Sequence, residues 1–239
     1  YGDHRDLHVR SRRQRQMCIR DSSRMKTREY EAKYSRPTSS VKLIAVSKKQ
    51  SIDSIREAAK NGISNFGENY FQEAYTKIES LKSLNLTWHF IGPIQSNKTL
   101  KIANNFDWVQ SVDREKIATR LNEHREEHLT PLKICIQINL SDEDSKSGVS
   151  LKKAEELCLT VENLSNLELR GIMSIPAPES DFQKQRANFE KLRSKFLVLQ
   201  KKFPGMDTLS MGMSGDFEAA IAEGSTMIRL GSALFGPRA

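Results

Sequence analysis

Short apolar runs alternate with amphipathic segments from about residue 41 onward. The first run, Leu43–Val46, is short enough to form a strand buried on both faces, and it leads into Ser47 and Lys48. The segment that follows, residues 51–60, repeats its apolar residues at helical spacing, and Gly62 is well placed to end that helix. The pattern therefore opens with one β/α unit whose strand carries Lys48 at its carboxyl end.

Seven more units follow with the same alternation. The apolar runs predict strands within Ile63–Tyr70, Trp88–Gly92, Trp108–Val112, Leu132–Leu140, Leu169–Ile175, Asp207–Met211 and Thr226–Leu230. The intervening patterns predict helices over Phe71–Ser83, Thr99–Asn104, Asp113–Glu127, Ser150–Asn163, 181–202, Phe217–Glu223 and a last turn at Gly231–Phe235. We expect Asp113 and Ser150 to cap their helices. Eight repeats with short connections predict an α/β fold, a single-domain TIM-type (β/α)8 barrel, with a doubly wound open sheet as the structural alternative.

The first 24 residues differ from the rest. Residues 12–22 have no helical or strand period and resemble a translated sequencing adapter, so we interpret residues 1–24 as an artefactual or disordered basic tail. The alternative is a natural basic arm. We assign residues 25–239 to the barrel, with a helix over Met25–Tyr34 that ends before Pro37.

Charge and cysteine content narrow the classes of function. The formal net charge is +8, but residues 1–28 hold nine Lys or Arg and three Asp, and the remaining chain has a surplus of only two positive charges. A nearly neutral globular part gives little support to nucleic-acid binding. Three scattered cysteines argue for a reducing compartment and against a disulfide framework or a zinc site. Without a signal peptide or a membrane-spanning run, we expect a cytoplasmic protein.

Lys48 is the first candidate for chemistry. In β/α folds the carboxyl ends of the strands carry the active site, and a partly desolvated lysine there can form a Schiff base with an aldehyde. The alternative is a solvated loop lysine like Lys49. The strand alone does not decide between these two interpretations.

Two glycine-rich loops near the carboxyl end supply the second half of the predicted site. Ser210–Asp216 follows the seventh strand, and there we expect Ser214 to cap the next helix. Gly231 and Ser232 follow the eighth strand. Loops in these two positions form the usual phosphate site of this barrel, although each alone could be an ordinary turn with a capping serine.

Arg229 lies at the end of the eighth strand, beside the second loop. It could be a structural ion-pair partner. If it instead faces a ligand, an arginine directed at a pyridine nitrogen keeps that nitrogen unprotonated, which permits a Schiff base but suppresses carbanion reactions. A lysine, a phosphate cradle and an arginine near a ring nitrogen together suit pyridoxal 5'-phosphate (PLP).

Several motifs also resemble those of a known family. The matching stretches are Leu43–Lys48, Phe66–Tyr70, Trp88–Lys98, Gly171–Pro176, Leu209–Asp216 and Arg229–Gly236. Together they resemble the pyridoxal phosphate homeostasis protein family from about Val41 to the end. The resemblance implies a barrel like the amino-terminal domain of alanine racemase (fold type III).

The resemblance also implies roles for individual residues. PLP would be held as a Schiff base on Lys48, with phosphate contacts from Ser214, Gly231 and Ser232 and with Arg229 near the ring nitrogen. The matching motifs further imply that Asn69, Met173 and Met213 line the pocket. Ser232 stands where threonine is expected, and it keeps the hydroxyl.

The family implies a non-catalytic cytosolic protein that buffers PLP or delivers it to PLP-dependent apoenzymes. We expect a monomer that binds neither nucleic acid nor membrane. We also expect no resident metal, because Asp142, Glu143 and Asp144 lack the alternation of a calcium loop.

Three alternatives remain open. A fold-type III amino-acid racemase needs a second base from a separate β-rich domain, which we do not expect here; Tyr70 and Tyr75 are the nearest substitutes. A Schiff-base aldolase usually takes its lysine from a later strand. The third alternative, a nucleic-acid binder, is supported by the basic tail alone.

Two other residues have structural interpretations. We interpret His89 as a hydrogen-bonded core residue and Cys135 as a small core hydrophobe.

Overall fold

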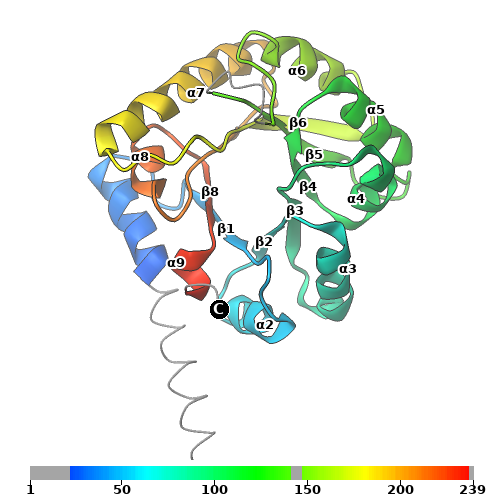
Figure 1. Ribbon diagram of the computed structural model, residues 1–239, viewed down its shortest axis with the longest axis horizontal. Coiled ribbons are helices and arrows are strands. Elements are labelled where there is room, and N and C mark those ends of the chain that lie inside the picture. Colours follow the sequence, from blue (N-terminus) through cyan, green and yellow to red (C-terminus); the bar gives the residue numbers. More distant parts are fainter. Residues whose placement is uncertain (1–21, 141–146, 237–239) are drawn as a thin grey trace, which may run out of the picture.

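Eight parallel strands close into one barrel in a computed structural model that describes residues 22–140 and 147–236. The strands pair in sequence order, and β1 also pairs with β8, so the predicted barrel is confirmed and the open sheet is excluded. Figure 1 looks down this ring of strands, with the helices outside it. The strands are β1 (Lys42–Val46), β2 (Asn65–Glu68), β3 (Thr87–Phe90), β4 (Trp108–Val112), β5 (Leu132–Gln137), β6 (Leu167–Met173), β7 (Thr208–Ser210) and β8 (Met227–Leu230).

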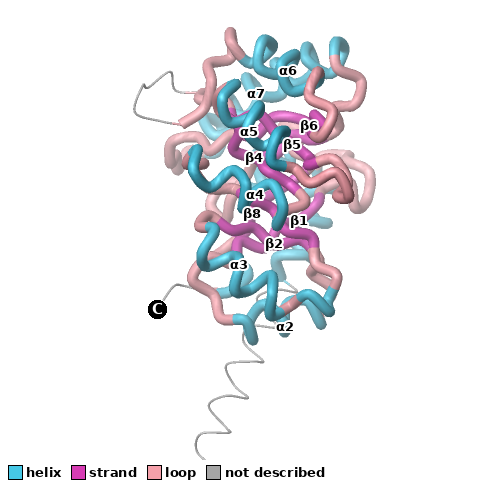
Figure 2. Tube along the Cα trace, turned by 90° about the vertical axis from the view of Figure 1, so that its right-hand side faces the viewer, coloured by secondary structure: helices cyan, strands magenta, loops and turns pink. Residues whose placement is uncertain are grey.

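The helices cover the outside of the barrel, as the side view in Figure 2 also shows. They are α2 (Ile52–Lys60), α3 (Phe71–Ser80), α4 (Thr99–Asn105), α5 (Glu115–His124), α6 (Ala154–Glu162), α7 (Phe182–Lys202), α8 (Phe217–Ala222) and α9 (Ser232–Phe235), with 3-10 turns at η1 (Lys82–Leu84) and η2 (Ser96–Lys98). Every predicted strand and helix has its counterpart, and most differences are a few residues at the ends.

Three predicted helix caps are wrong. Arg114, not Asp113, precedes α5, and the Asp113 carboxylate instead accepts a hydrogen bond from the Arg114 side chain at 2.6 Å. A turn at residues 151–153 separates Ser150 from α6. Ser214 does not cap α8 either, because two further residues intervene and Asp216 takes the N-cap position.

The alternation of side chains along the strands builds two apolar layers. The larger layer lies between strands and helices and is fully buried at residues such as Phe66, Ile134 and Phe189. The smaller layer fills the barrel itself and consists of Ile44, Trp108, Cys135, Met173 and Met227. Cys135 is therefore a buried core residue, as expected.

Residues 22–33 are helical and pack against the seam between β1 and β8. Ser23 Oγ donates to the carbonyl of Ala233 at 2.5 Å, and Arg24 donates to the carbonyl of Asn61 at 2.8 Å. Residues 22–24 thus belong to the folded structure, although the sequence pattern placed them in the tail. Residues 1–21 and most of the predicted loop at 141–148 lie outside the described residues. Within the described part, no helix is both long and apolar enough to cross a membrane.

Candidate functional site

Lys48 lies at the carboxyl end of β1 and is half-buried. Inner and outer positions alternate along this strand: Ile44 belongs to the cluster inside the barrel, whereas Ala45 packs outside it. Ser47 also faces outward, because its side chain bonds to Glu68 in the layer below α3. Continuing the alternation places Lys48 on the inner side, above the packed barrel interior.

The backbone on both sides of Lys48 is fixed by α3. Lys77 on α3 donates to the carbonyl of Ser47 at 2.6 Å and to the Glu68 carboxylate at 2.7 Å. The backbone N–H of Lys49, whose φ of 61° lies in the left-handed region, donates to Glu73. Burial raises the pKa of Glu68, and the Lys77 ammonium opposes that shift. This cluster holds the turn that presents Lys48.

Arg229 lies on the inner side of β8, and its Cα pairs with that of Ile44 on β1. Only 3% of the residue is exposed. Its guanidinium donates to Ser210 Oγ at 2.6 Å and to the carbonyl of Ser174 at 2.9 Å. Burial lowers the pKa of Arg229 to about 10, so the group stays charged at neutral pH. Arg229 thus carries a buried positive charge, and its two hydrogen-bond acceptors, Ser210 Oγ and the Ser174 carbonyl, are both neutral.

The loops after β7 and β8 meet through Ser214. Its Oγ accepts a hydrogen bond from the backbone N–H of Ala233, at the start of α9, at 3.3 Å. Gly231 lies beside Val46 of β1, since a Cβ at position 231 would be 3.6 Å from the Val46 Cβ. Ser232 is exposed and Met213 is half-buried on the same two loops. Of the predicted phosphate residues, Gly231 thus lies next to the strand that carries Lys48, and Ser214 is bonded to the start of α9, directly after Gly231 and Ser232.

Gly212 makes the sharp turn between β7 and this loop. Its φ is +99°, and a Cβ there would lie 2.7 Å from the Cβ of Ala220. Asp216 accepts a hydrogen bond from the N–H of Met213 at 2.5 Å and closes the loop on itself. Burial raises the pKa of Asp216, while the nearby Arg229 charge opposes that shift.

Asn69 and Met173, which the sequence predicts to line the pocket, both lie on the inner side of the barrel. The β1–β2 register, continued two residues past Val46 and Gly67, places Asn69 opposite Lys48. The buried Asn69 Oδ1 has no hydrogen-bond partner among the described residues. A buried oxygen in this state is costly unless a donor reaches it, so it marks a place for a ligand group. Met173 is fully buried inside the barrel, below the loops.

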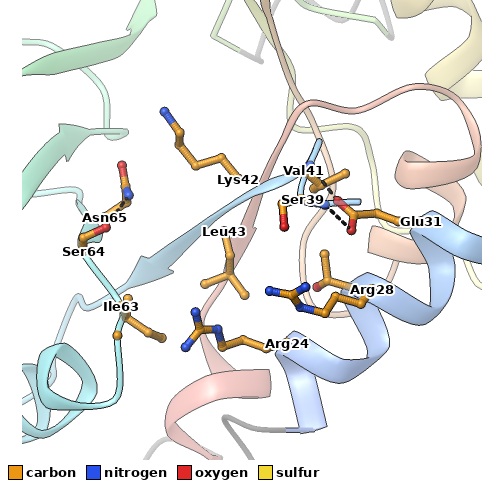
Figure 3. Close-up of a pocket in the computed structure, with 12 residues that line it drawn as sticks. Arg24, Arg28, Glu31, Ser39, Val41, Lys42, Leu43, Ile63, Ser64 and Asn65 are labelled. Carbon is orange, nitrogen blue, oxygen red and sulfur yellow. Dashed lines mark hydrogen bonds between the residues drawn. The ribbon is translucent and has the colours of Figure 1, made fainter. Parts of the chain in front are cut away.

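A separate cavity of about 210 Å³ opens at the opposite, amino-terminal end of the strands. Figure 3 shows Arg24 and Arg28 projecting from the first helix toward Leu43 and Ile63. None of the eight predicted cofactor-binding residues lines it. Its position does not coincide with the site around Lys48.

Sequence reasoning missed the residues that support the site. Lys77 and Glu73 were interpreted only as part of a helix, and Ser174 and Ser210 had no role beyond their motifs. For Lys77 the local signal is its i,i+4 spacing from Glu73, with which it forms an ion pair at 2.6 Å, but its contacts with Ser47 and Glu68 come from distant parts of the chain.

Comparison with known proteins identifies the family of this chain. Residues 24–239 match the family model described as alanine racemase, N-terminal domain. Curated proteins named "Pyridoxal phosphate homeostasis protein" are 49% identical over 201 residues in Escherichia coli (strain K12) and 51% identical over 203 residues in Pseudomonas aeruginosa. These alignments cover 83% and 85% of this chain and 86% and 87% of the two relatives.

Two solved structures are also similar to this chain. PipY from Synechococcus elongatus, solved with PLP bound, is 38% identical, with a TM-score of 0.77, over 87% of this chain and 99% of that one. Alanine racemase from Corynebacterium glutamicum is 17% identical, with a TM-score of 0.65, over 92% of this chain and 62% of that one, and it shares the fold alone.

Proposed function

Because this chain belongs to the pyridoxal phosphate homeostasis protein family, we propose that it binds PLP at Lys48 and serves in the homeostasis of that cofactor. One observation carries the proposal. Lys48, Arg229 and Gly231 occupy inner positions on the adjacent strands β1 and β8 or directly after them, at the end of the barrel where β/α folds place their chemistry.

The residues present fit the cofactor. Bound PLP supplies an aldehyde that condenses reversibly with a lysine amine, and Lys48 would provide that amine. Ser214, Gly231 and Ser232 would hold the phosphate on the two loops. Arg229 would donate to the ring nitrogen. The unpartnered Asn69 Oδ1 would accept from a donor group of the ligand, and Met173 and Met213 would line the pocket.

We further propose that the protein holds and releases PLP without turning over a substrate. An arginine at the ring nitrogen keeps that nitrogen unprotonated and makes the ring a poor electron sink. The two tyrosines nearest the site in sequence, Tyr70 and Tyr75, are 63% and 44% exposed, so neither is buried beside Lys48 as a second base. PLP-dependent apoenzymes would receive the released PLP.

The test is an absorption titration with PLP of the wild type, Lys48→Ala and the neighbouring control Lys49→Ala. We expect a Schiff-base band that borohydride fixes in the wild type and in Lys49→Ala, and no such band in Lys48→Ala. Absence of the band from all three proteins would overturn the proposal.

A racemase assay on alanine and serine separates a carrier from an enzyme. We expect the wild type, loaded with PLP, to show no more turnover than Lys48→Ala. Turnover above that control would contradict the non-catalytic role and favour the racemase alternative, which shares this fold.

Ser214 tests the phosphate contacts independently of the lysine. Replacing Ser214 with Ala removes one hydroxyl from the loop after β7, and we expect a roughly tenfold weaker affinity for PLP. Affinity for pyridoxal, which has the same ring and aldehyde without the phosphate, should not change. Equal weakening for both ligands would show that Ser214 does not act through the phosphate.

A further inference from the structure

A chain of hydrogen-bonded side chains crosses the inside of the barrel from Arg229 to the opposite end. Arg229 Nη1 donates to Ser210 Oγ at 2.6 Å, and Ser210 Oγ donates to Gln110 Oε1 at 2.7 Å. Gln110 Nε2 lies 3.0 Å from His89 Nδ1, and His89 Nε2 lies 3.0 Å from Asn65 Oδ1. These five residues come from β8, β7, β4, β3 and β2, and we name them the interior chain.

The bond directions in the interior chain follow from Arg229 together with the amide orientation of Gln110 in the structure. A guanidinium only donates, so Ser210 Oγ accepts from Arg229, and the Ser210 hydroxyl donates its own proton to Gln110 Oε1. Gln110 then presents its NH₂ group to His89, whose Nδ1 must accept. His89 is therefore neutral, with its proton on Nε2, which donates to Asn65 Oδ1. In each of the four bonds, the donor is the residue that lies nearer to Arg229 along the interior chain.

The far end of the interior chain reaches the amino-terminal face. Asn65 Nδ2 donates to Ser64 Oγ at 3.0 Å, and both residues line the cavity at that end, as Figure 3 shows.

Burial makes the interior chain sensitive to any break. Ser210, Gln110 and His89 have no exposed surface. The second N–H of Gln110 is also used, because Nε2 lies 3.1 Å from Met227 Sδ. A buried donor or acceptor that loses its hydrogen-bond partner destabilises the fold by more than an average hydrogen bond stabilises it. The complete interior chain is therefore favoured over arrangements in which one of its bonds is broken.

The neighbours of His89 disfavour the protonated ring. His89 stacks on Trp108, with ring centroids 5.4 Å apart. The charged groups that act on it are Lys42 of β1 and Lys133 of β5, both positive, and the barrel buries it completely. Burial, with these two ammonium groups, lowers the pKa of His89 to about 3. The imidazole therefore remains an acceptor at Nδ1 throughout the physiological range.

We propose that Ser210, Gln110 and His89 are positioning residues that hold the charged Arg229 in the orientation in which it meets the ring nitrogen of PLP. This inference rests on the proposed function, since it takes Arg229 as the partner of that nitrogen. Ser210 fixes one end of the guanidinium and the Ser174 carbonyl fixes the other. Gln110 and His89 keep the Ser210 hydroxyl turned so that its oxygen faces Arg229. None of the three reacts with the cofactor.

The first measurement is the tautomer of His89 by ¹⁵N NMR of the full chain before PLP is added. We expect a neutral ring with the proton on Nε2. A ring with its proton on Nδ1, or a charged ring at neutral pH, would overturn the directional chain whether or not PLP binds.

The second measurement compares Ser210→Ala with Cys135→Ala. Each removes one atom from the same fully buried barrel interior, but only Ser210→Ala breaks the interior chain. We expect Ser210→Ala to weaken PLP affinity roughly tenfold and to shift the absorption maximum of bound PLP or the pH at which its band changes. Cys135→Ala should keep the wild-type spectrum and affinity.

Gln110→Met provides a second variant, since it interrupts the chain at nearly constant volume if Ser210→Ala fails to fold. Wild-type affinity and spectrum in a folded variant of either kind would overturn the positioning role. If the wild type itself bound no PLP, the proposed function would fail and the positioning role with it. The His89 tautomer would still report on the chain separately.

Discussion

His89 and Arg229 show how burial inside the barrel sets the chemistry of single residues. Both are ionisable side chains that are almost completely buried, and burial is the main cause of the lowered pKa of each. Arg229 stays charged although its pKa falls to about 10, and His89 stays neutral. His89 therefore makes a pH-dependent contribution to the free energy of unfolding.

Stability should fall on acidification through His89. The pKa of His89 is about 3 in the folded protein against 6.5 for the free side chain, so only the unfolded chain takes up this proton between those values. Proton uptake by the unfolded state lowers the free energy of unfolding as pH drops from about 6.5 toward 3.

Urea titrations at pH 7 and pH 4.5 measure this effect in the wild type and in His89→Gln. The glutamine amide can still accept from Gln110 and donate to Asn65 but takes up no proton. We expect the wild type to lose about 2–3 kcal/mol more than the variant between the two pH values. The same loss in both proteins would show that His89 titrates normally in the fold.

At the scale of the element, the strands carry irregularities that the apolar pattern does not reveal. The register between β5 and β6 shifts between Ile134 and Cys135, and Gly171 of β6 lies directly against β7. A Cβ at position 171 would be 1.7 Å from the carbonyl oxygen of Thr208. Glycine is thus required for the close approach of these two strands.

Replacing Gly171 with Ala should therefore separate β6 from β7. We expect a loss of about 3 kcal/mol or more in the free energy of unfolding, since backbone cannot yield as a side chain does. Gly205→Ala is the matched control, because a Cβ there would lie 3.8 Å from the nearest atom, the Leu169 carbonyl oxygen, and should cost less than about 1 kcal/mol. Equal stability of the two variants, measured by urea denaturation, would contradict this packing.

The sequence predicted the strands and helices better than it predicted their caps and the side chains that hold the site residues in place. Period and turn residues are local signals, so the eight strands were identified and β4 and the start of α4 were placed to the residue. The caps at Asp113, Ser150 and Ser214 were wrong, because the conformation of the preceding turn decides which residue becomes the cap. The roles of Lys77 and Gln110 depend on partners far along the chain, which no local pattern reveals.

For the whole molecule, closure of the barrel brings the first and last strands together, and the helical residues 22–33 pack at that seam. Glu31 is 2% exposed and accepts from the backbone N–H groups of Ser39 and Val41, at 3.0 and 2.8 Å. Figure 3 shows these two bonds. Lys33 and Tyr34 reach Glu218 on α8. The chain before β1 is therefore part of the folded unit.

Glu31→Ala should destabilise the barrel as a whole. The substitution leaves two backbone N–H groups without their partner, and we expect a loss of about 2–4 kcal/mol in the free energy of unfolding. Glu29→Ala, on the exposed side of the same helical stretch, should change it by less than about 0.5 kcal/mol. Thermal denaturation of the two variants tests this, and similar midpoints would show that the first helix contributes little to the seam.

The proposed function requires that PLP attaches to Lys48. The direct measurement is peptide mapping by mass spectrometry after the wild type has been incubated with PLP and reduced with borohydride. We expect the pyridoxyl phosphate group on Lys48, with none on the adjacent Lys49. Modification of Lys49 or of scattered surface lysines, with Lys48 unmodified, would contradict it.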